Sequence, residues 1–287
     1  MTEVCMKGKH VAVTGATAGI GRAASMELAR RGARLTLFCR SAEKAAILER
    51  EIRNDGGDVS IIIMDMADLA SVREAAKIFL QREEALDVLL NNAGIVNTSR
   101  KESAQGYEET LAVNHFAPFL LTGLLLPALR SGQKSRIVNV SSGAHAFVKD
   151  MGYEDMQAKQ KYSTFHEYGR SKLANILFTR QLAHILARDD ITVNCLHPGA
   201  VSTSLGTQNN GLMGKVLPLL LKPFFRTPEK GAETSLYLCS SEEVAEISGE
   251  YFVNCKAVKP RRWARDDAAA QRLWDYTEQI LDFRYPL

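Results

Sequence analysis

A tyrosine and a lysine stand four residues apart in the segment "YGRSKLAN" (168–175), with small or polar residues between them. Because positions i and i+4 of a helix share one face, a helix here would hold Tyr168 beside Lys172. A cation about 4 Å from a phenol favours the phenolate by up to about 4 kcal/mol at an effective dielectric near 20. That energy corresponds to roughly three pKa units, which would bring a phenol of pKa about 10 toward neutral pH. The pair therefore predicts proton transfer by Tyr168, with Lys172 lowering its pKa.

A glycine-rich segment, "TGATAGIG" (14–21), joins the first apolar run to a helical pattern. Gly15 permits a tight turn, Gly19 lets the backbone approach a pyrophosphate, and Gly21 allows the helix to pack closely. The N-terminus of that helix would present free N–H groups to an anion. An ordinary strand-to-helix turn is the alternative, and the place of the segment after the first strand favours nucleotide binding.

The elements that must position these residues alternate between short apolar runs and longer helical patterns. Near-continuous apolar character, typical of a parallel sheet buried on both faces, predicts strands at 10–16, 34–40, 59–65, 87–93, 136–142 and 191–197. The alternation predicts an α/β fold, a Rossmann-type doubly wound parallel sheet with helices on both faces, in one domain over residues 1–287. Beyond residue 200 we expect a substrate-covering region at about 203–227, a last strand at 250–255 and a C-terminal helix at about 266–283.

The composition excludes several classes of function. With 46% hydrophobic and 24% charged residues the chain is typical of a soluble globular protein, and a net charge of +3 is too small to indicate a nucleic-acid partner. The five cysteines and six histidines have no metal-ligand spacing, so no metal is expected. The opening "MTEVCMKGK" leaves no room for a signal peptide or anchor, and the apolar stretch 116–129 is too short to span a bilayer. We therefore expect a cytoplasmic protein without a transmembrane segment.

Several motifs occur together and in order: the GxxxGxG spacing of the glycine segment, "NNAG" (91–94), and the Tyr168–Lys172 pair. On these residues the whole chain resembles the short-chain dehydrogenase/reductase family. The segments "SKLANILFTRQLA", "HPGAVST" and "SSGAH" are most similar to its retinol-dehydrogenase-like branch. The resemblance implies an oxidoreductase that interconverts a hydrophobic aldehyde or ketone and its alcohol by hydride transfer, and a homo-oligomer.

The resemblance also implies a catalytic set of Asn114, Ser142, Tyr168 and Lys172. Ser142, the second serine of "VSSG", would orient the substrate carbonyl oxygen as charge develops on it. Asn114 would anchor a water that relays protons to Lys172, and Lys172 would also hydrogen-bond the nicotinamide ribose. Serine and asparagine alone more often cap turns and helices, but the four residues in family order favour catalysis.

Cofactor contacts are implied in the same way. Asp65, at the end of the third predicted strand, would accept a hydrogen bond from the adenine amino group. The other contacts follow the strand ends: Gly15, Thr17, Gly19, Ile20 and Gly21 in the glycine segment; Arg40 and Lys44; Met66; Asn92, Ala93 and Gly94 on the adenine-ribose side; Tyr168 and Lys172; and Pro198, Gly199, Val201 and Thr203 at the nicotinamide.

The end of the second predicted strand indicates which nicotinamide cofactor is used. NAD-specific relatives carry there a carboxylate that binds the ribose 2′-OH, whereas this chain has Cys39 followed by Arg40. The planar fork of an arginine suits a 2′-phosphate, and Lys44 would add to that site. Ala18 departs from many NADP-dependent relatives, which carry a basic residue at that position, and an ordinary solvated Arg40 is the alternative. NADP(H) is predicted in preference to NAD(H).

Two segments would wall the substrate pocket. The 25 residues between Ser142 and Tyr168 resemble an insertion of the retinol-dehydrogenase-like branch. The apolar segment 211–227 would be a lid over a lipophilic substrate, with ordinary packing, a subunit interface or membrane contact as alternatives. The basic segment 256–265 indicates a solvated strip, with weak attraction to anionic surfaces as the alternative.

The rival to an oxidoreductase is a non-catalytic protein that binds NADP(H) as a sensor. Such a protein has no use for a proton-transfer set, so the intact set favours the enzyme. Reduction of an activated C=C bond is a further alternative, because it would use the same tyrosine and lysine. Turnover distinguishes an enzyme from a sensor.

Overall fold

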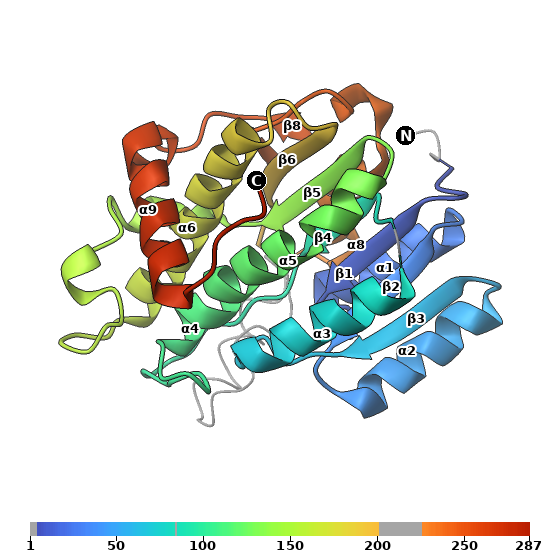
Figure 1. The fold of residues 1–287 in the computed structure, drawn as a ribbon, viewed down its shortest axis with the longest axis horizontal. Coiled ribbons are helices and arrows are strands. Elements are labelled where there is room, and N and C mark those ends of the chain that lie inside the picture. The colour runs from blue at the N-terminus through green and yellow to red at the C-terminus, as the bar shows by residue number, and fades with distance from the viewer. Residues whose placement is uncertain (1–4, 84, 201–225) are drawn as a thin grey trace.

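A sheet of eight strands lies at the centre of the computed structural model, which describes residues 5–83, 85–200 and 226–287 (Figure 1). The strand order is β3-β2-β1-β4-β5-β6-β7-β8. The strands are β1 (His10–Thr14), β2 (Arg34–Cys39), β3 (Asp58–Ile63), β4 (Val88–Asn91), β5 (Ser135–Val140), β6 (Ile191–His197) and β7 (Tyr251–Val253), all parallel, and β8 (Lys256–Ala257), antiparallel to β7. The chain order reverses between β1 and β4, where ligands bind in sheets of this kind.

Helices cover both faces of the sheet. On one face lie α1 (Gly19–Arg30), α2 (Ala42–Asn54) and α8 (Pro228–Ser240), and on the other α3 (Leu69–Arg82), α5 (Ala117–Ser131), α6 (Thr164–Ile185) and α9 (Asp267–Leu281). Each face has its own apolar core, and successive strand residues alternate between the two: Val11 and Val13 belong to one core and Ala12 to the other. The predicted doubly wound α/β class is confirmed.

All seven predicted strands are present, and most end earlier than predicted. Asn92 and Ser142, for example, lie just beyond β4 and β5 and turn toward a cavity at this edge of the sheet. The predicted strands were too long because apolar or small residues continue past the true strand ends. The sequence pattern does not show where hydrogen bonding between strands stops. The short antiparallel β8 was not predicted.

A continuous helical stretch of 23 residues, Glu109–Ser131, comprises α4 (Glu109–Leu111), the π-helical turn η1 (Ala112–Phe116) and α5. Among the described residues it is the one helix long and apolar enough to cross a membrane, with a mean hydropathy of 1.5. It extends beyond the apolar stretch 116–129 of the sequence, but 89% of its most apolar window is buried inside the protein. Its apolar character is therefore accounted for by its place in the core.

The C-terminal helix α9 lies within the range predicted for it and packs on α6 (Figure 1). Asp266 caps it by accepting hydrogen bonds from Ala268 N and Ala269 N. The tail that follows crosses α5, where the Tyr285 hydroxyl donates to the Phe119 carbonyl at 2.7 Å. Of the predicted substrate-covering region 203–227, all but the last two residues lie outside the described residues.

Candidate active site

A cavity of about 590 Å³ opens along the carboxyl ends of β1 to β6, and we call it the carboxyl-edge cavity. It is lined by Ser142, Tyr168, Lys172 and every described residue expected to contact the cofactor. Asn114 does not line it, and Val201 and Thr203 lie outside the described residues. Residues from six strand ends, far apart in the sequence, therefore meet in one site because parallel strands all end at the same edge.

The glycine segment forms a close-fitting cradle at one end of this cavity. Gly15 has a φ of +67°, and a Cβ atom on it would lie 2.9 Å from the Ala93 Cα. A Cβ on Gly21 would lie 2.4 Å from the Asn92 Nδ2, so both positions require glycine. At the start of α1 no side chain caps the helix and the first turn has no acidic residue. The free N–H groups there suit the pyrophosphate of a dinucleotide.

Thr14 and Asn92 tie the cradle to the neighbouring strand. The Thr14 Oγ1 accepts hydrogen bonds from the backbone N–H groups of Asn92 and Ala93, both at 3.0 Å. The Asn92 side chain donates to the Thr14 carbonyl at 2.9 Å. Asn92 thus acts on the site mainly by fixing the glycine segment. Sequence reasoning missed Thr14, whose signal is a threonine at the buried end of the first strand.

The other end of the cavity is basic. Arg40 and Lys44 are exposed at its edge, and Ser41 between them caps α2 by accepting from Lys44 N at 3.3 Å. Cys39 is buried, and burial raises the pKa of its thiol to about 12, so no anion stands at the end of β2. Asp65 accepts from Ala67 N at 2.9 Å through Oδ1, which holds the turn after β3.

Tyr168 and Lys172 lie on one face of α6, as their spacing predicts, and both face the cavity. The Lys172 Nζ lies 5.7 Å from the centroid of the Tyr168 ring and donates to the Val140 carbonyl at 3.0 Å. A Cβ on Gly94 would lie 3.3 Å from that Nζ and 3.4 Å from the Asn114 Oδ1, so only glycine leaves this corner open. The glycine of "NNAG" therefore adjoins the lysine itself.

The expectation that Lys172 lowers the pKa of Tyr168 is not met in the protein alone. Burial raises the pKa of Tyr168 above its ordinary value, and the hydrogen bond with the Ser142 side chain opposes that rise. Burial also lowers the pKa of Lys172 from 10.5 to about 8. The same loss of solvent disfavours the phenolate of Tyr168 and the ammonium of Lys172 alike.

The two serines after β5 have different partners. The Ser141 Oγ donates to the Lys172 carbonyl at 2.7 Å and is buried. Ser142 lines the cavity, bonds the Tyr168 phenol, and caps the short helix η2 (Gly143–Phe147) by accepting from Ala144 N at 3.2 Å. Gly169 allows η2 to lie against α6, because a Cβ there would be 2.8 Å from the Ala144 carbonyl oxygen.

Asn114 is fully buried behind the cavity wall. Its Oδ1 accepts from Ile95 N at 2.8 Å, and its Nδ2 donates to the Ile95 carbonyl at 3.0 Å and to the Ser171 Oγ at 2.9 Å. These bonds use both N–H groups of the side-chain amide and one of the two acceptor positions of its Oδ1, so we expect a water anchored by Asn114 to bind its backbone carbonyl. The sequence could not distinguish these two acceptors.

His197 and Phe147 also line the cavity. Sequence reasoning missed His197, whereas Phe147 lies in the segment between Ser142 and Tyr168 that was expected to wall the substrate pocket. His197 belongs to the "HPG" motif, of which only the proline and the glycine had been expected to contact the cofactor. The pKa of its imidazole is lowered mainly by burial and further by the charges of Arg226 and His145. Phe147 is 63% exposed and its ring lies 6.3 Å from that of Phe165, which is 72% exposed. Exposed aromatic rings at a cavity rim are unusual in a soluble protein and indicate an apolar ligand.

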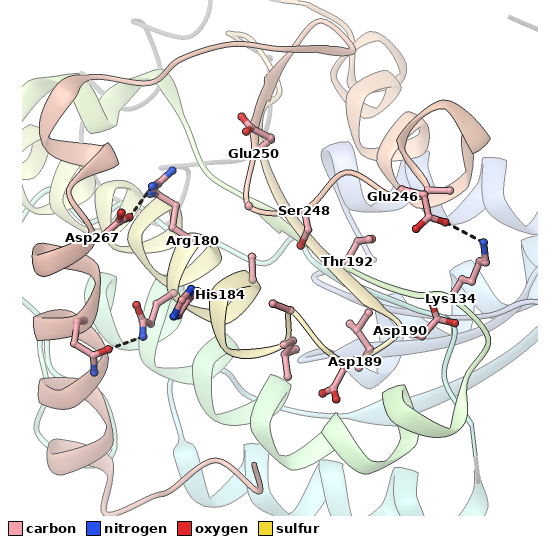
Figure 2. A pocket seen from close by; sticks show the side chains of 18 residues that line it. Lys134, Arg180, His184, Asp189, Asp190, Thr192, Glu246, Ser248, Glu250 and Asp267 are labelled. Carbon is pink, nitrogen blue, oxygen red and sulfur yellow. Dashed lines mark hydrogen bonds and ion pairs between the residues drawn. The ribbon is translucent and has the colours of Figure 1, made fainter.

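A second cavity, of about 700 Å³, lies at the amino ends of β5 and β6, and we call it the amino-edge cavity (Figure 2). Its charges are largely paired with one another: Arg180 with Asp267 at 2.6 Å and Lys134 with Glu246 at 2.9 Å. Among the described residues no group of three or more His, Cys, Asp or Glu side chains could hold a metal ion. The larger cavity thus lacks the features that mark the smaller one.

Comparison with known proteins agrees with this geometry. The model of the family described as short chain dehydrogenase matches residues 9–211. The chain belongs to that family. Human retinol dehydrogenase 14 is 43% identical over 299 residues, with 96% of this chain and 87% of that protein covered. Human retinol dehydrogenase 12 is 40% identical, with 99% and 90% covered, so this member is an oxidoreductase of the retinol-dehydrogenase-like branch.

Solved structures show the same fold. A putative uncharacterized protein from Mycobacterium paratuberculosis is 29% identical, with a TM-score of 0.79 and 99% of this chain and 97% of that one covered. A short chain dehydrogenase from Burkholderia cenocepacia in complex with NADP is 26% identical, with a TM-score of 0.68 and 86% and 96% covered. Together with the cradle at α1, the family supports a nicotinamide dinucleotide as the cofactor.

The expectation of a cytoplasmic protein is wrong. Retinol dehydrogenases 11 to 14, at 38–43% identity in their human forms, belong to a branch of membrane-associated enzymes rather than free cytoplasmic proteins. The expectation rested on the short opening segment and on the apolar stretch 116–129 being too short to span a bilayer, and neither shows how a folded enzyme associates with a membrane surface.

Proposed function

We propose that this protein is an NADP(H)-dependent oxidoreductase that interconverts a hydrophobic aldehyde or ketone and its alcohol. The observation that carries the proposal is the meeting of Ser142, Tyr168 and Lys172 in the same cavity as the glycine cradle. A proton donor, a hydrogen-bonding serine and a cation beside a dinucleotide site are the parts that carbonyl reduction needs.

The cofactor would lie along the carboxyl-edge cavity, with its pyrophosphate at the start of α1 and its 2′-phosphate at Arg40 and Lys44. The absence of a carboxylate at the end of β2, where Cys39 is buried and neutral, supports NADP(H) over NAD(H). When bound, the nicotinamide supplies or accepts the hydride. The chain itself supplies the proton and the binding of the carbonyl oxygen.

Tyr168 is the proton donor in reduction and the acceptor in oxidation. Because burial raises its pKa, the phenol keeps its proton at neutral pH and is ready to protonate a carbonyl oxygen. The Ser142 hydroxyl, already bonded to the phenol, lies where it can hold the same oxygen as negative charge develops.

Lys172 supplies a proton to Tyr168 after the phenol has protonated the carbonyl oxygen. With a pKa of about 8 it is mostly a cation at neutral pH, yet it can release and regain a proton readily. Its bond to the Val140 carbonyl fixes the ammonium beside Gly94 and Asn114.

The substrate we propose is an apolar aldehyde or ketone, of the retinal kind. Phe147 at the rim, together with the partly buried Ile95 and the buried Val113, gives the cavity an apolar side. The names of the retinol dehydrogenase relatives support the same class. A sensor of NADP(H) would bind the cofactor without turnover, and a C=C reductase would leave the carbonyl intact.

Oxidation of NADPH by the purified protein tests the proposal, with all-trans-retinal, medium-chain aldehydes, hydrophobic ketones and an enone as substrates. Wild type should reduce at least one carbonyl, and Tyr168→Phe should lose about 10²- to 10⁴-fold in kcat while binding NADPH as tightly. Tyr162→Phe is the matched control, because Tyr162 bonds the Asn97 carbonyl instead of Ser142. Tight NADPH binding without turnover on any substrate would favour the sensor, and a saturated ketone product from the enone would favour the C=C reductase.

A further inference from the structure

The π-helical turn η1 carries Asn114, and its geometry has a local cause in the sequence. Ala117 N bonds the Ala112 carbonyl, five residues back instead of four. Pro118 has no N–H, so the carbonyl of Asn114, four residues earlier, cannot receive the usual α-helical hydrogen bond. Single π turns of this kind are rare and occur often at functional sites. Pro118 thus leaves the Asn114 carbonyl without its α-helical partner.

A second contact holds η1 from outside the cavity wall. The His115 Nε2 lies 3.0 Å from the Oγ1 of Thr277 on α9, and these residues are 162 positions apart in the chain. The Thr277 hydroxyl donates its own hydrogen to the Leu273 carbonyl at 2.7 Å. The Thr277 oxygen must therefore accept, so His115 carries its proton on Nε2.

Burial of His115 at this position costs free energy, because one of its ring nitrogens has no hydrogen-bond partner in the described part of the chain. It is 1% exposed among aromatic rings that include Phe116, Phe119 and Phe178, and its Nδ1 has no hydrogen-bond partner in the described part of the chain. Burial lowers the pKa of His115 to about 3, so the ring stays neutral in the working range. A leucine would fill this space without an unsatisfied nitrogen, which leaves the bond to Thr277 as the feature that requires histidine.

On its other side the same turn is joined by hydrogen bonds to α6, the helix that carries Tyr168 and Lys172. The Asn114 Nδ2 donates to the Ser171 Oγ at 2.9 Å, and the Ser171 Oγ donates to the Tyr168 carbonyl at 2.8 Å. Hydrogen bonds therefore link Thr277 to His115 on one side of η1, and the neighbouring Asn114 to the backbone of Tyr168 through Ser171 on the other. A shift of the turn would move the Asn114 carbonyl and disturb the helix that carries the proton donor.

We propose that α9, through the bond between Thr277 and His115, holds η1 so that the Asn114 carbonyl oxygen serves the proton supply of Lys172. Thr277 and His115 are positioning residues, since neither lines the cavity. The inference rests on the proposed function. Loss of the bond should slow proton supply and lower kcat, while the KM values for NADPH and for the carbonyl, which depend on the cavity lining, should stay the same.

The kinetic test compares Thr277→Val, which keeps the shape and removes the hydroxyl, with Thr277→Ser, which keeps the hydroxyl. Thr277→Val should lower kcat about ten- to a hundredfold at unchanged KM and increase the solvent deuterium isotope effect on kcat. Thr277→Ser should restore most of the activity. The control is Thr234→Val, a buried helical threonine on the other face of the sheet whose Oγ1 accepts from Cys255 N at 3.3 Å.

A second measurement does not depend on turnover. In ¹⁵N-labelled protein the His115 ring should show the Nε2–H tautomer, with a slowly exchanging proton that becomes fast in Thr277→Val. Unchanged kcat and isotope effect in Thr277→Val, or a loss equal to that of Thr234→Val, would overturn the inference while wild-type turnover upheld the proposed function. Absence of turnover in wild type on every carbonyl would overturn both.

Discussion

The two cavities of this protein lie at opposite edges of one sheet and differ in how their charges are placed. In the amino-edge cavity, oppositely charged side chains lie within 3 Å of each other at the surface, as Arg180 and Asp267 do at 2.6 Å (Figure 2). In the carboxyl-edge cavity, Lys172 is buried with no carboxylate partner among the described residues, and Tyr168 beside it is partly buried. The first arrangement pairs opposite charges in contact with solvent, whereas the second holds two ionisable groups whose pKa values are shifted by burial.

The comparison teaches that size does not identify the site. The amino-edge cavity is larger, at about 700 Å³ against about 590 Å³. The carboxyl-edge cavity contains the N-terminus of α1, the glycine cradle, and Tyr168 with Lys172. These features lie together because the loops that follow parallel strands all start at the same edge of the sheet. Strongly shifted pKa values are common at functional sites, where ionisable groups are buried. Ion pairs at the protein surface remain solvated and contribute little to stability.

Replacing Lys172 by methionine should have the largest effect of all: it should lower activity and raise the stability of the folded protein. kcat should fall by about 10²- to 10⁴-fold because proton supply and the site cation are lost. The pKa of Lys172 is about 8 in the folded protein against 10.5 ordinarily, a difference that corresponds to roughly 3 kcal/mol. At pH 7 the wild type bears this cost of a buried cation, so Lys172→Met should be about 2 kcal/mol more stable after loss of the bond to Val140.

The sign of the pH dependence follows from the same values. Between pH 8 and pH 10.5 the unfolded chain binds the lysine proton and the folded chain does not, so wild-type stability rises with pH across this window. The advantage of Lys172→Met should therefore shrink between pH 7 and pH 10, as measured by urea unfolding. Lys77→Met, at an exposed lysine of α3, should change stability by less than about 0.5 kcal/mol at either pH. A variant less stable than wild type at pH 7 would contradict the buried-cation account.

Arg40→Asp should have the next largest effect, and it tests the basic end of the carboxyl-edge cavity. Each charge-assisted hydrogen bond to a 2′-phosphate contributes about 1.5–3 kcal/mol, so the preference for NADPH over NADH should fall about a hundredfold or invert. The measurement is kcat/KM for each cofactor with one carbonyl substrate. Arg50→Asp makes the same charge change on the exposed surface of α2 and should leave the preference within about twofold. An equal effect of both variants would mean that overall charge, and not a 2′-phosphate contact, sets the preference.

Phe147→Ala should have a smaller effect that depends on the substrate. Loss of the rim ring removes apolar contact worth about 1–2 kcal/mol, so KM for a long apolar aldehyde should rise about five- to tenfold. KM for a short aldehyde that does not reach the rim should stay unchanged, as should KM for NADPH. Phe147→Leu retains most of the apolar area and should behave nearly as wild type. A uniform rise in KM for short and long substrates would place the ring in catalysis or folding and not at the entrance.

Local features of this molecule could be predicted from the sequence, and long-range ones could not. The α6 face that carries Tyr168 and Lys172, the glycine segment and the positions of the seven predicted strands along the chain follow from patterns a few residues long. The contact between His115 and Thr277 joins positions 162 apart, and no local pattern encodes it. The raised pKa of Tyr168 was also beyond prediction, because it depends on how much solvent the assembled cavity excludes.

The smallest effect should come from Arg180→Gln, which removes from the amino-edge cavity the cation that pairs with Asp267. The Asp267 side chain is 82% exposed, so solvent screens the pair and the stability change should stay within about 0.5 kcal/mol. kcat and both KM values should match wild type, measured beside Phe147→Ala in one set of assays. Asp267 is the first residue of α9, and Thr277 lies ten residues later on the same helix. A fall in kcat of about threefold or more would therefore contradict this expectation. It would mean that α9 couples the two edges of the sheet, and the contrast between a solvated cavity and a catalytic one would then fail.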